Sequence, residues 1–153
     1  METPGKPPRR QQPEPVQQPD ALNESVCFEL LRSVEVGRLA VRIPEGGVDI
    51  FPVNFIVDGG TILLRTAAGT KLSSIEEEPI VAFEADHFDW YERTAWSVVV
   101  KGEASRVTDH NELFELFNVE LDAWQHERKP FFVRIVPTMT TGRRFTVQRR
   151  ITP

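Results

Sequence analysis

The sequence has little cysteine and no long apolar run. Cys27 is the single cysteine among 153 residues, which excludes an intramolecular disulfide and any metal or iron–sulfur site built from several cysteines. A lone cysteine also suits a reducing compartment, so the cytoplasm is the expected location. The sequence contains no stretch of about 18 apolar residues. We therefore expect no transmembrane helix and no membrane partner.

An excess of positive charge is also missing. The chain has 18 lysines and arginines against 23 aspartates and glutamates, a formal net charge of −5, and such a molecule repels polyanions at long range. We therefore expect no nucleic-acid partner. The histidines His87, His110 and His126 fall in separate segments without paired spacing, so no metal site is expected. The sequence also lacks a P-loop and a glycine-rich dinucleotide fingerprint.

The first 20 residues differ from the rest of the chain in composition. They hold six of the twelve prolines and four glutamines, and Val16 is their only branched aliphatic residue. Such a segment buries too little apolar surface to offset its ordering entropy. We predict a disordered tail over residues 1–20 and a folded domain over 21–153. A spacer is favoured over a proline-rich peptide ligand for the tail.

The first half of the folded part predicts one helix followed by strands. Asn23 can cap a helix whose apolar residues recur at helical spacing up to Val34. Alternating apolar residues and turn signals then predict strands over 39–43, 48–55 and 61–66. The last of these is followed by a short helix that Thr70 is expected to cap.

The second half predicts further strands around one more helix. Apolar alternation predicts strands over 80–85, 96–107, 131–136 and 144–148, with a bulge at Gly102 and a loop over 86–91. Asp109 and Glu112 form a capping box for a helix, whose apolar face is Leu113, Leu116, Phe117, Leu121 and Trp124. Many antiparallel strands with few helices favour a mostly β fold, a small closed or half-closed barrel.

The segment after the third strand carries the strongest chemical signal. Arg65 and Thr66 end the strand, and Thr70 and Lys71 begin the short helix. A lysine is normally disfavoured at a helix N-terminus, where the dipole is already positive, unless an anion joins it. Backbone N–H groups, two hydroxyls and two cations could together bind a phosphate. The alternative is a capped surface helix whose Lys71 pairs with one of the glutamates at 76–78.

Several blocks of the chain resemble the pyridoxamine 5′-phosphate oxidase-like family of split-barrel flavoproteins. They are Gly37-Arg38-Leu39-Ala40, Phe51-Pro52-Val53-Asn54-Phe55 with Asp58-Gly59, Leu64-Arg65-Thr66 with Gly69-Thr70-Lys71-Leu72, Trp96 to Ala104, Arg134-Ile135-Val136-Pro137 and Gly142-Arg143-Arg144-Phe145. The resemblance spans about residues 22–148. Their common order and spacing carry it, because no single block is specific.

The resemblance implies a six-stranded antiparallel split β-barrel that forms a homodimer, with FMN in a groove at the subunit interface. It assigns the phosphate to Arg65, Thr66, Thr70 and Lys71, with the adjoining Leu72. The edge of the flavin ring would lie along Pro52, Val53, Asn54 and Phe55, and Trp96 and Ser97 would close the groove.

Simpler structural roles compete with these assignments at some positions. Asn54 could instead bond a neighbouring loop, and Trp96 could belong to the core or an interface. The segment 86–91 could line a substrate entrance or cap the barrel.

The resemblance implies an FMN-dependent oxidoreductase in which the cofactor carries the electrons, so no catalytic side chain is assigned. NADH or NADPH would bind as a transient substrate. The alternative is a module that binds or senses a flavin, a deazaflavin or haem without turnover, and a third possibility is an interaction protein with an empty barrel.

Overall fold

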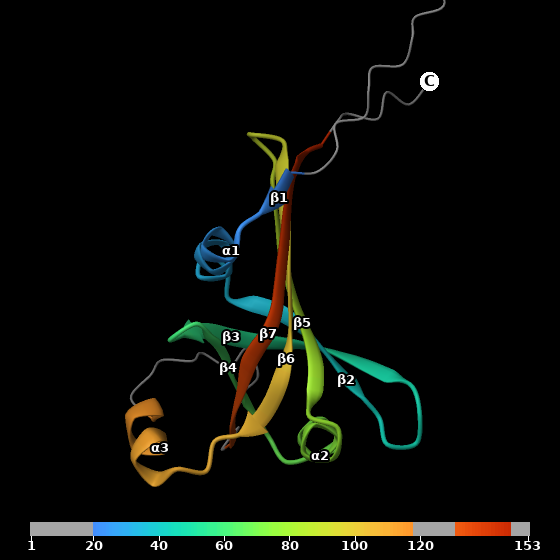
Figure 1. Ribbon diagram of the computed structural model, residues 1–153, viewed down its shortest axis with the longest axis vertical. Helices are drawn as coiled ribbons and strands as arrows, with labels where there is room; N and C mark the ends of the chain where they lie inside the picture. The colour runs from blue at the N-terminus through green and yellow to red at the C-terminus, as the bar shows by residue number, and fades with distance from the viewer. Residues whose placement is uncertain (1–19, 118–130, 148–153) are drawn as a thin grey trace, which may run out of the picture.

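The computed structural model describes residues 20–117 and 131–147. Within these residues the chain forms seven strands and three helices (Figure 1). The strands are β1 (Asp20–Leu22), β2 (Val36–Arg42), β3 (Val48–Asp58), β4 (Thr61–Thr66), β5 (Ile80–Asp89), β6 (Thr94–Arg106) and β7 (Phe131–Thr146). The helices are α1 (Glu24–Leu31), α2 (Thr70–Glu77) and α3 (His110–Leu116).

Six of the strands close into an antiparallel barrel. Their order is β7-β4-β3-β2-β5-β6, and pairing of β6 with β7 closes the ring. The short β1 adds to the far end of β7, where Asp20 lies opposite Arg144. At this end β5, β6 and β7 extend past the barrel, and α1 lies against β6 and β7 (Figure 1). The predicted mostly β fold, a six-stranded antiparallel barrel with a few helices, is confirmed.

Local sequence signals explain several of these elements. The Asn23 side chain accepts a hydrogen bond from the Val26 N–H at 2.9 Å and so caps α1 as predicted. The turn between β3 and β4 consists of Gly59 and Gly60, whose φ angles are 55° and 77°. Two consecutive positive φ angles match the twist of a two-residue hairpin, and glycine adopts them without steric cost.

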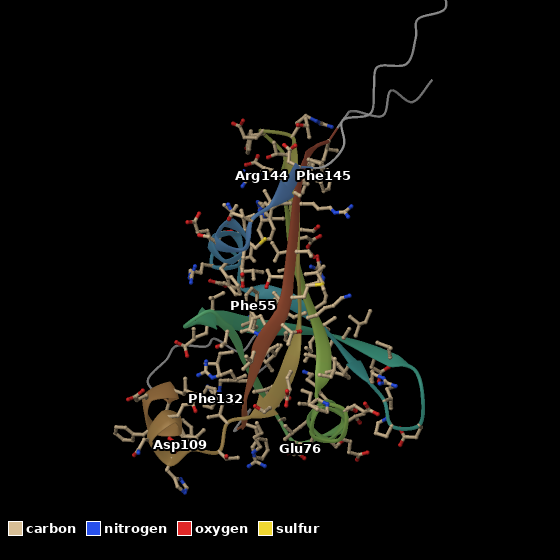
Figure 2. The ribbon with its side chains drawn as sticks, in the orientation of Figure 1. Phe55, Glu76, Asp109, Phe132, Arg144 and Phe145 are labelled. Atoms are coloured by element: carbon tan, nitrogen blue, oxygen red, sulfur yellow. The ribbon has the colours of Figure 1, made fainter. Side chains whose placement is uncertain are left out.

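The core has a main part inside the barrel and a smaller part outside it. Inside, Phe55 stacks edge-on against Phe83, with ring centroids 4.6 Å apart. Outside, α3 covers Phe132 on β7, and the labelled positions of Phe55 and Phe132 mark the two parts (Figure 2). The smaller cluster consists of the buried residues Leu63, Val107, Leu116 and Phe132.

A bulge in β6 and β7 changes which β7 residues face outward. The register shifts between Lys101 and Gly102, as the glycine predicted. A Cβ atom at Gly102 would collide with the Val136 carbonyl, so glycine is required for this close approach. Val136 pairs with Glu103, and Met139 pairs with Lys101. Because Lys101 and Glu103 lie two residues apart on one face of β6, the bulge brings Val136 and Met139 to that same face.

The structure corrects two predictions of strand limits. The strands predicted over 131–136 and 144–148 are one continuous strand, β7, because β6 pairs with it along almost its whole length. The predicted loop over 86–91 is wrong up to Asp89, since β5 continues to that residue. The tail over 1–19, the helix residues Leu121 and Trp124, and residue 148 lie outside the described residues. Among the described helices, none has the length and apolarity to cross a membrane.

Candidate functional site

The connection between β4 and α2 carries the predicted phosphate-binding residues. Gly69 precedes the first helical residue with a φ of 149°, and its carbonyl accepts a hydrogen bond from the Ser73 N–H at 3.0 Å. The prediction that Thr70 caps α2 is therefore wrong, because Gly69 occupies the cap and Thr70 is already helical. Gly69 supplies no side-chain cap. The N–H groups of the first turn thus point toward the surface without a capping side chain.

The two predicted cations of this connection lie over aromatic rings. The Arg65 guanidinium carbon lies 5.1 Å from the centre of the Phe132 ring, and the Lys71 ammonium lies 5.0 Å from that of Phe51. Phe132 belongs to β7 and Phe51 to β3, so the cations lean toward opposite neighbours of β4. Each cation is attracted to the negative face of the π system of its ring.

The remaining residues of this connection differ in exposure. Thr66 is 3% exposed, and its hydroxyl donates to the Ala67 carbonyl at 3.2 Å. Leu72 is buried in the main core, whereas Thr70 is exposed. The first turn of α2 contains no acidic residue. The exposed part of this corner is therefore basic and carries backbone donors, a combination that suits an anion.

Strand β3 divides the predicted ring-binding residues between its two faces. Val53 and Phe55 are 5% and 3% exposed and face the barrel interior. Pro52 and Asn54 alternate with them and face outward. A ligand on the outside of the barrel would therefore meet the side chains of Pro52 and Asn54, and the backbone of the other two residues.

Trp96 and Ser97 likewise face opposite sides of β6. Trp96 is 8% exposed and belongs to the main core, with its ring centre 6.4 Å from that of His87. Ser97 is half-buried on the other face and pairs with Asp86 of β5. Ser97 therefore shares the outside of the barrel with Pro52 and Asn54, and Trp96 does not.

A charged cluster on the same outer face was missed from the sequence. Arg38 of β2 lies between Pro52 of β3 and Glu84 of β5 in the strand register. Its Nη1 donates to Asp86 Oδ1 at 2.6 Å and to Glu84 Oε2 at 3.2 Å. The signal that could have found the cluster is the spacing of Glu84 and Asp86, two residues apart and thus on one face of a strand.

The ionisation of this cluster follows from its contacts. The hydrogen bond from Arg38 to Asp86 raises the pKa of the guanidinium, which stays charged. Partial burial, and then repulsion from Asp86, raise the pKa of Glu84, although Arg38 opposes this shift. Two carboxylates thus share one cation.

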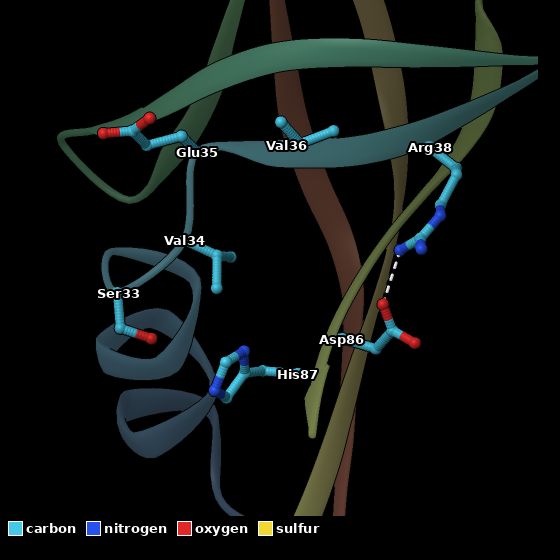
Figure 3. Close-up of a pocket in the computed structure, with 7 residues that line it drawn as sticks. All are labelled: Ser33, Val34, Glu35, Val36, Arg38, Asp86 and His87. Atoms are coloured by element: carbon cyan, nitrogen blue, oxygen red, sulfur yellow. Dashed lines mark hydrogen bonds and ion pairs between the residues drawn. The ribbon is translucent and has the colours of Figure 1, made fainter. Parts of the chain in front are cut away.

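A pocket opens beside this cluster, where β2 separates from β5 (Figure 3). It has a volume of about 470 Å³ and is lined by Ser33, Val34, Glu35, Val36, Arg38, Asp86 and His87. None of the residues predicted to bind a flavin lines it. Within residues 20–117 and 131–147, no group of three or more histidine, cysteine, aspartate or glutamate side chains is placed to hold a metal ion.

Comparison with known proteins connects this geometry to a family. The family model described as pyridoxamine 5′-phosphate oxidase matches residues 23–144. A solved structure from Corynebacterium glutamicum is 43% identical and covers 89% of this chain and 100% of its own, with a TM-score of 0.78. The FAD binding protein from Mycobacterium smegmatis is 38% identical, with coverages of 82% and 97% and a TM-score of 0.66. Protein Rv0080 of Mycobacterium tuberculosis is 32% identical over 93% of this chain and 95% of its own length.

Proposed function

This chain belongs to the pyridoxamine 5′-phosphate oxidase family, and on that premise we propose that it binds a flavin, FMN, and acts as a flavin-dependent oxidoreductase. The M. smegmatis relative, named as an FAD binding protein, supports a flavin as the ligand. We propose further that the protein is a homodimer with the flavin at the subunit interface.

The observation that carries this proposal is the basic corner between β4 and α2. Lys71 stands in the first turn of α2, which lacks both a capping side chain and an acidic residue. Space is open at the cap, since a Cβ at Gly69 would meet no heavy atom within 4 Å. Arg65 is the second-to-last residue of β4, the strand that leads into this turn. These donors fit the terminal phosphate of a flavin nucleotide.

The chain's own residues would bind and orient the cofactor. Arg65, Lys71 and the first-turn N–H groups of α2 would hold the phosphate. Pro52, Asn54 and Ser97 face the outside of the barrel and would position the ring there. A bound flavin would supply hydride or electron transfer, so no side chain of the chain need act as acid or base.

Titration of the purified protein with FMN tests the phosphate site. We expect Lys71→Ala to weaken binding about tenfold or more, since hydrogen bonds to charged groups contribute about 1.5–3 kcal/mol. Arg32→Ala is the control, because this exposed arginine follows α1, outside the proposed site. Equal affinity in the two variants would refute the assignment of the phosphate.

FAD is the second candidate cofactor, favoured by the name of the M. smegmatis relative. The two nucleotides are distinguished by mass analysis of the small molecule that denaturation releases from freshly purified protein. Release of FMN supports the proposal. Release of FAD would show that the cofactor is FAD and not FMN, and the assignment of the phosphate-binding residues would stand.

Turnover is tested separately from binding. Addition of NADH or NADPH to the yellow protein should bleach the flavin absorbance if the reduced nicotinamide acts as a transient substrate. A coloured protein that no nicotinamide reduces would instead indicate a binding or sensing module.

A further inference from the structure

Phe51 of β3 is the aromatic neighbour of the lysine in the basic corner between β4 and α2. The Lys71 ammonium lies 5.0 Å from the centre of the Phe51 ring, within the distance at which the face of a ring attracts a cation. Both residues are half-buried. Because the pair is partly shielded from water, this attraction is stronger than it would be at a fully exposed site.

Both ends of this contact belong to elements that pack into one core. Phe51 pairs with Leu39 in the β2–β3 ladder and packs against the main core. Lys71 is the second residue of α2, and Leu72 and Ile75 anchor this helix in the same core. The ring therefore holds the ammonium at a defined place relative to the barrel and to the start of α2.

Such a support matters for a lysine that binds a phosphate. A helical side chain leans toward the N-terminus of its helix, so Lys71 leans toward the uncapped first turn of α2. Ordering a lysine carries one of the largest rotamer-entropy costs of any side chain, and a ring that orders it beforehand lowers the cost of binding. A ring also leaves the charge of the ammonium in place, whereas a carboxylate would compete with the phosphate for it.

Phe51 differs in its surroundings from Phe132, the ring beside Arg65. Phe132 is fully buried and packs edge-on against Phe117 in the smaller core. Its truncation would leave a cavity, whatever the ring does for Arg65. Phe51 keeps part of its surface exposed, so its effect on Lys71 can be measured apart from its packing.

We propose that Phe51 is a positioning residue for the flavin phosphate, that it acts through Lys71, and that it makes the site selective for a phosphorylated flavin over riboflavin. The inference rests on the proposed flavin function and adds to it a residue that determines which form of the flavin binds. Riboflavin has the same ring system and ribityl chain as FMN but no phosphate, so it does not engage Lys71. Loss of the Phe51 ring face therefore weakens FMN and leaves riboflavin unaffected.

Titration of the full chain, freed of bound flavin, with FMN and with riboflavin tests the proposal. Phe51→Leu keeps an apolar side chain against the core and removes the ring face. We expect it to weaken FMN about three- to tenfold, within the range of one partly buried cation–π contact, and to change riboflavin affinity by less than about twofold.

Phe88→Leu is the matched control for this titration. Phe88 is also a half-buried phenylalanine on a strand, but it packs edge-on against Trp90 at the end of β5 far from α2. This variant should change the affinity for neither flavin.

Three further variants separate the attraction of the ring from its packing. Phe51→Tyr keeps the ring face and should retain the FMN affinity of the parent protein. A fluorinated phenylalanine at position 51 closely keeps the shape of the ring but reduces the negative charge of its face, so it should weaken FMN even if Phe51→Leu does not fold. In the Lys71→Ala background, Phe51→Leu should have no further effect on FMN, because the pair is already lost.

The outcomes distinguish this inference from the flavin function. Equal FMN affinity in the parent protein and in Phe51→Leu, or equal losses for FMN and riboflavin, would overturn the role of Phe51. If Lys71→Ala still weakens FMN in that case, the phosphate site stands. Absence of FMN binding to the parent protein would refute the flavin function and this inference together.

Discussion

Gly142 lies on β7 directly beneath α1, and its missing side chain allows the helix to pack. A Cβ at this position would collide with Cys27 Sγ and would lie 3.3 Å from Leu22 Cβ. Cys27 is fully buried in the main core, so it has no room to move away. We expect Gly142→Ala to lower the free energy of unfolding by about 1–3 kcal/mol, the usual cost of overpacking, in urea denaturation.

The double variant provides the control for this prediction. Cys27→Ala removes the colliding sulfur, so Gly142→Ala should cost clearly less in that background than in the parent protein. Equal costs in the two backgrounds would show that the destabilisation has another origin.

Asp89 ends β5 and holds the turn that leads into β6. Its Oδ1 accepts hydrogen bonds from the N–H groups of Tyr91 and Glu92 at 2.8 and 2.9 Å. The bond from Glu92, followed by that from Tyr91, lowers the pKa of Asp89 from its ordinary value of 3.8. Because the folded pKa lies below the unfolded one, the stabilisation is present above pH 3.8 and is lost as pH falls through the folded pKa.

Asp89→Asn tests this dependence, since the amide oxygen can still accept both bonds but does not titrate. We expect the parent protein to be the more stable at neutral pH, and the difference to shrink as pH falls below 3.8. Urea denaturation midpoints over this pH range measure it. A difference independent of pH would contradict the assignment.

At the scale of elements, Arg134 of β7 fastens α3 to the barrel. Its Nη2 lies 2.7 Å from Glu112 Oε1 on α3, and its Nη1 lies 2.8 Å from Asp58 Oδ2 at the end of β3. The Arg134 side chain is 19% exposed. Glu112 was predicted as part of a capping box, and Asp109 does accept a bond from the Glu112 N–H at 2.8 Å. The Glu112 carboxylate bonds Arg134.

Arg134→Met should loosen α3 while it keeps much of the side-chain volume. We expect a loss of about 1–3 kcal/mol in the free energy of unfolding, because charged hydrogen bonds in a partly buried site are removed. An increase in amide exchange rate, relative to the parent protein, that is larger in α3 than in β2 would show that the effect is local. Arg42→Gln, which breaks an exposed ion pair with Glu78 at 3.4 Å, is the control and should change stability by less than about 1 kcal/mol. Equal losses in the two variants would contradict the fastening role.

Elements whose signals are local could be predicted from the sequence. Asn23 caps α1, the Gly59-Gly60 pair makes the β3–β4 turn, and Gly102 marks the bulge, because each depends on side-chain or backbone properties within a few residues. The basic residues at the β4–α2 connection were found for the same reason. The N-cap of α2 was not predicted correctly, since the helix starts from Gly69, whose φ of 149° is a backbone conformation that favours glycine.

Features that depend on distant pairing could not be predicted. Residues 137–142 include Pro137, two adjacent threonines and Gly142, without apolar alternation, and they are held in β7 by β6. The Arg38–Glu84 contact joins residues 46 positions apart. Its existence depends on the register between β2 and β5, which the sequence of either strand alone does not determine.

At the scale of the whole molecule, an apolar strip on the outside of β7 bears on the proposed homodimer. Val136, Met139 and Phe145 are 50%, 55% and 39% exposed. The bulge at Gly102 turns Val136 and Met139 to the same face, and Thr141 and Arg143 separate them from Phe145, which lies farther along the strand (Figure 2). Exposed apolar side chains grouped on one strand face favour burial against another surface, and a second copy of this chain is the occupant that the proposed interface requires.

The paired change Val136→Glu with Met139→Glu tests this interface by light scattering during gel filtration. If the strip forms the subunit contact, burial of two carboxylates from each chain is unfavourable, so a dimer of the parent protein should become a monomer. Val48→Glu, at an exposed apolar position on β3, is the control and should remain dimeric. Far-UV circular dichroism should be the same for all three proteins.

The same variants decide whether the flavin site needs both subunits. The strip contains none of the residues assigned to the flavin, so a monomer with an intact fold should keep full FMN affinity if the site lies within one subunit. We expect instead that the Val136→Glu, Met139→Glu protein loses FMN affinity together with its partner, whereas the Val48→Glu protein keeps both. A monomer that binds FMN as tightly as the dimer would refute a site shared between subunits. The residues of one subunit, including those of the basic corner at α2, would then be sufficient for binding.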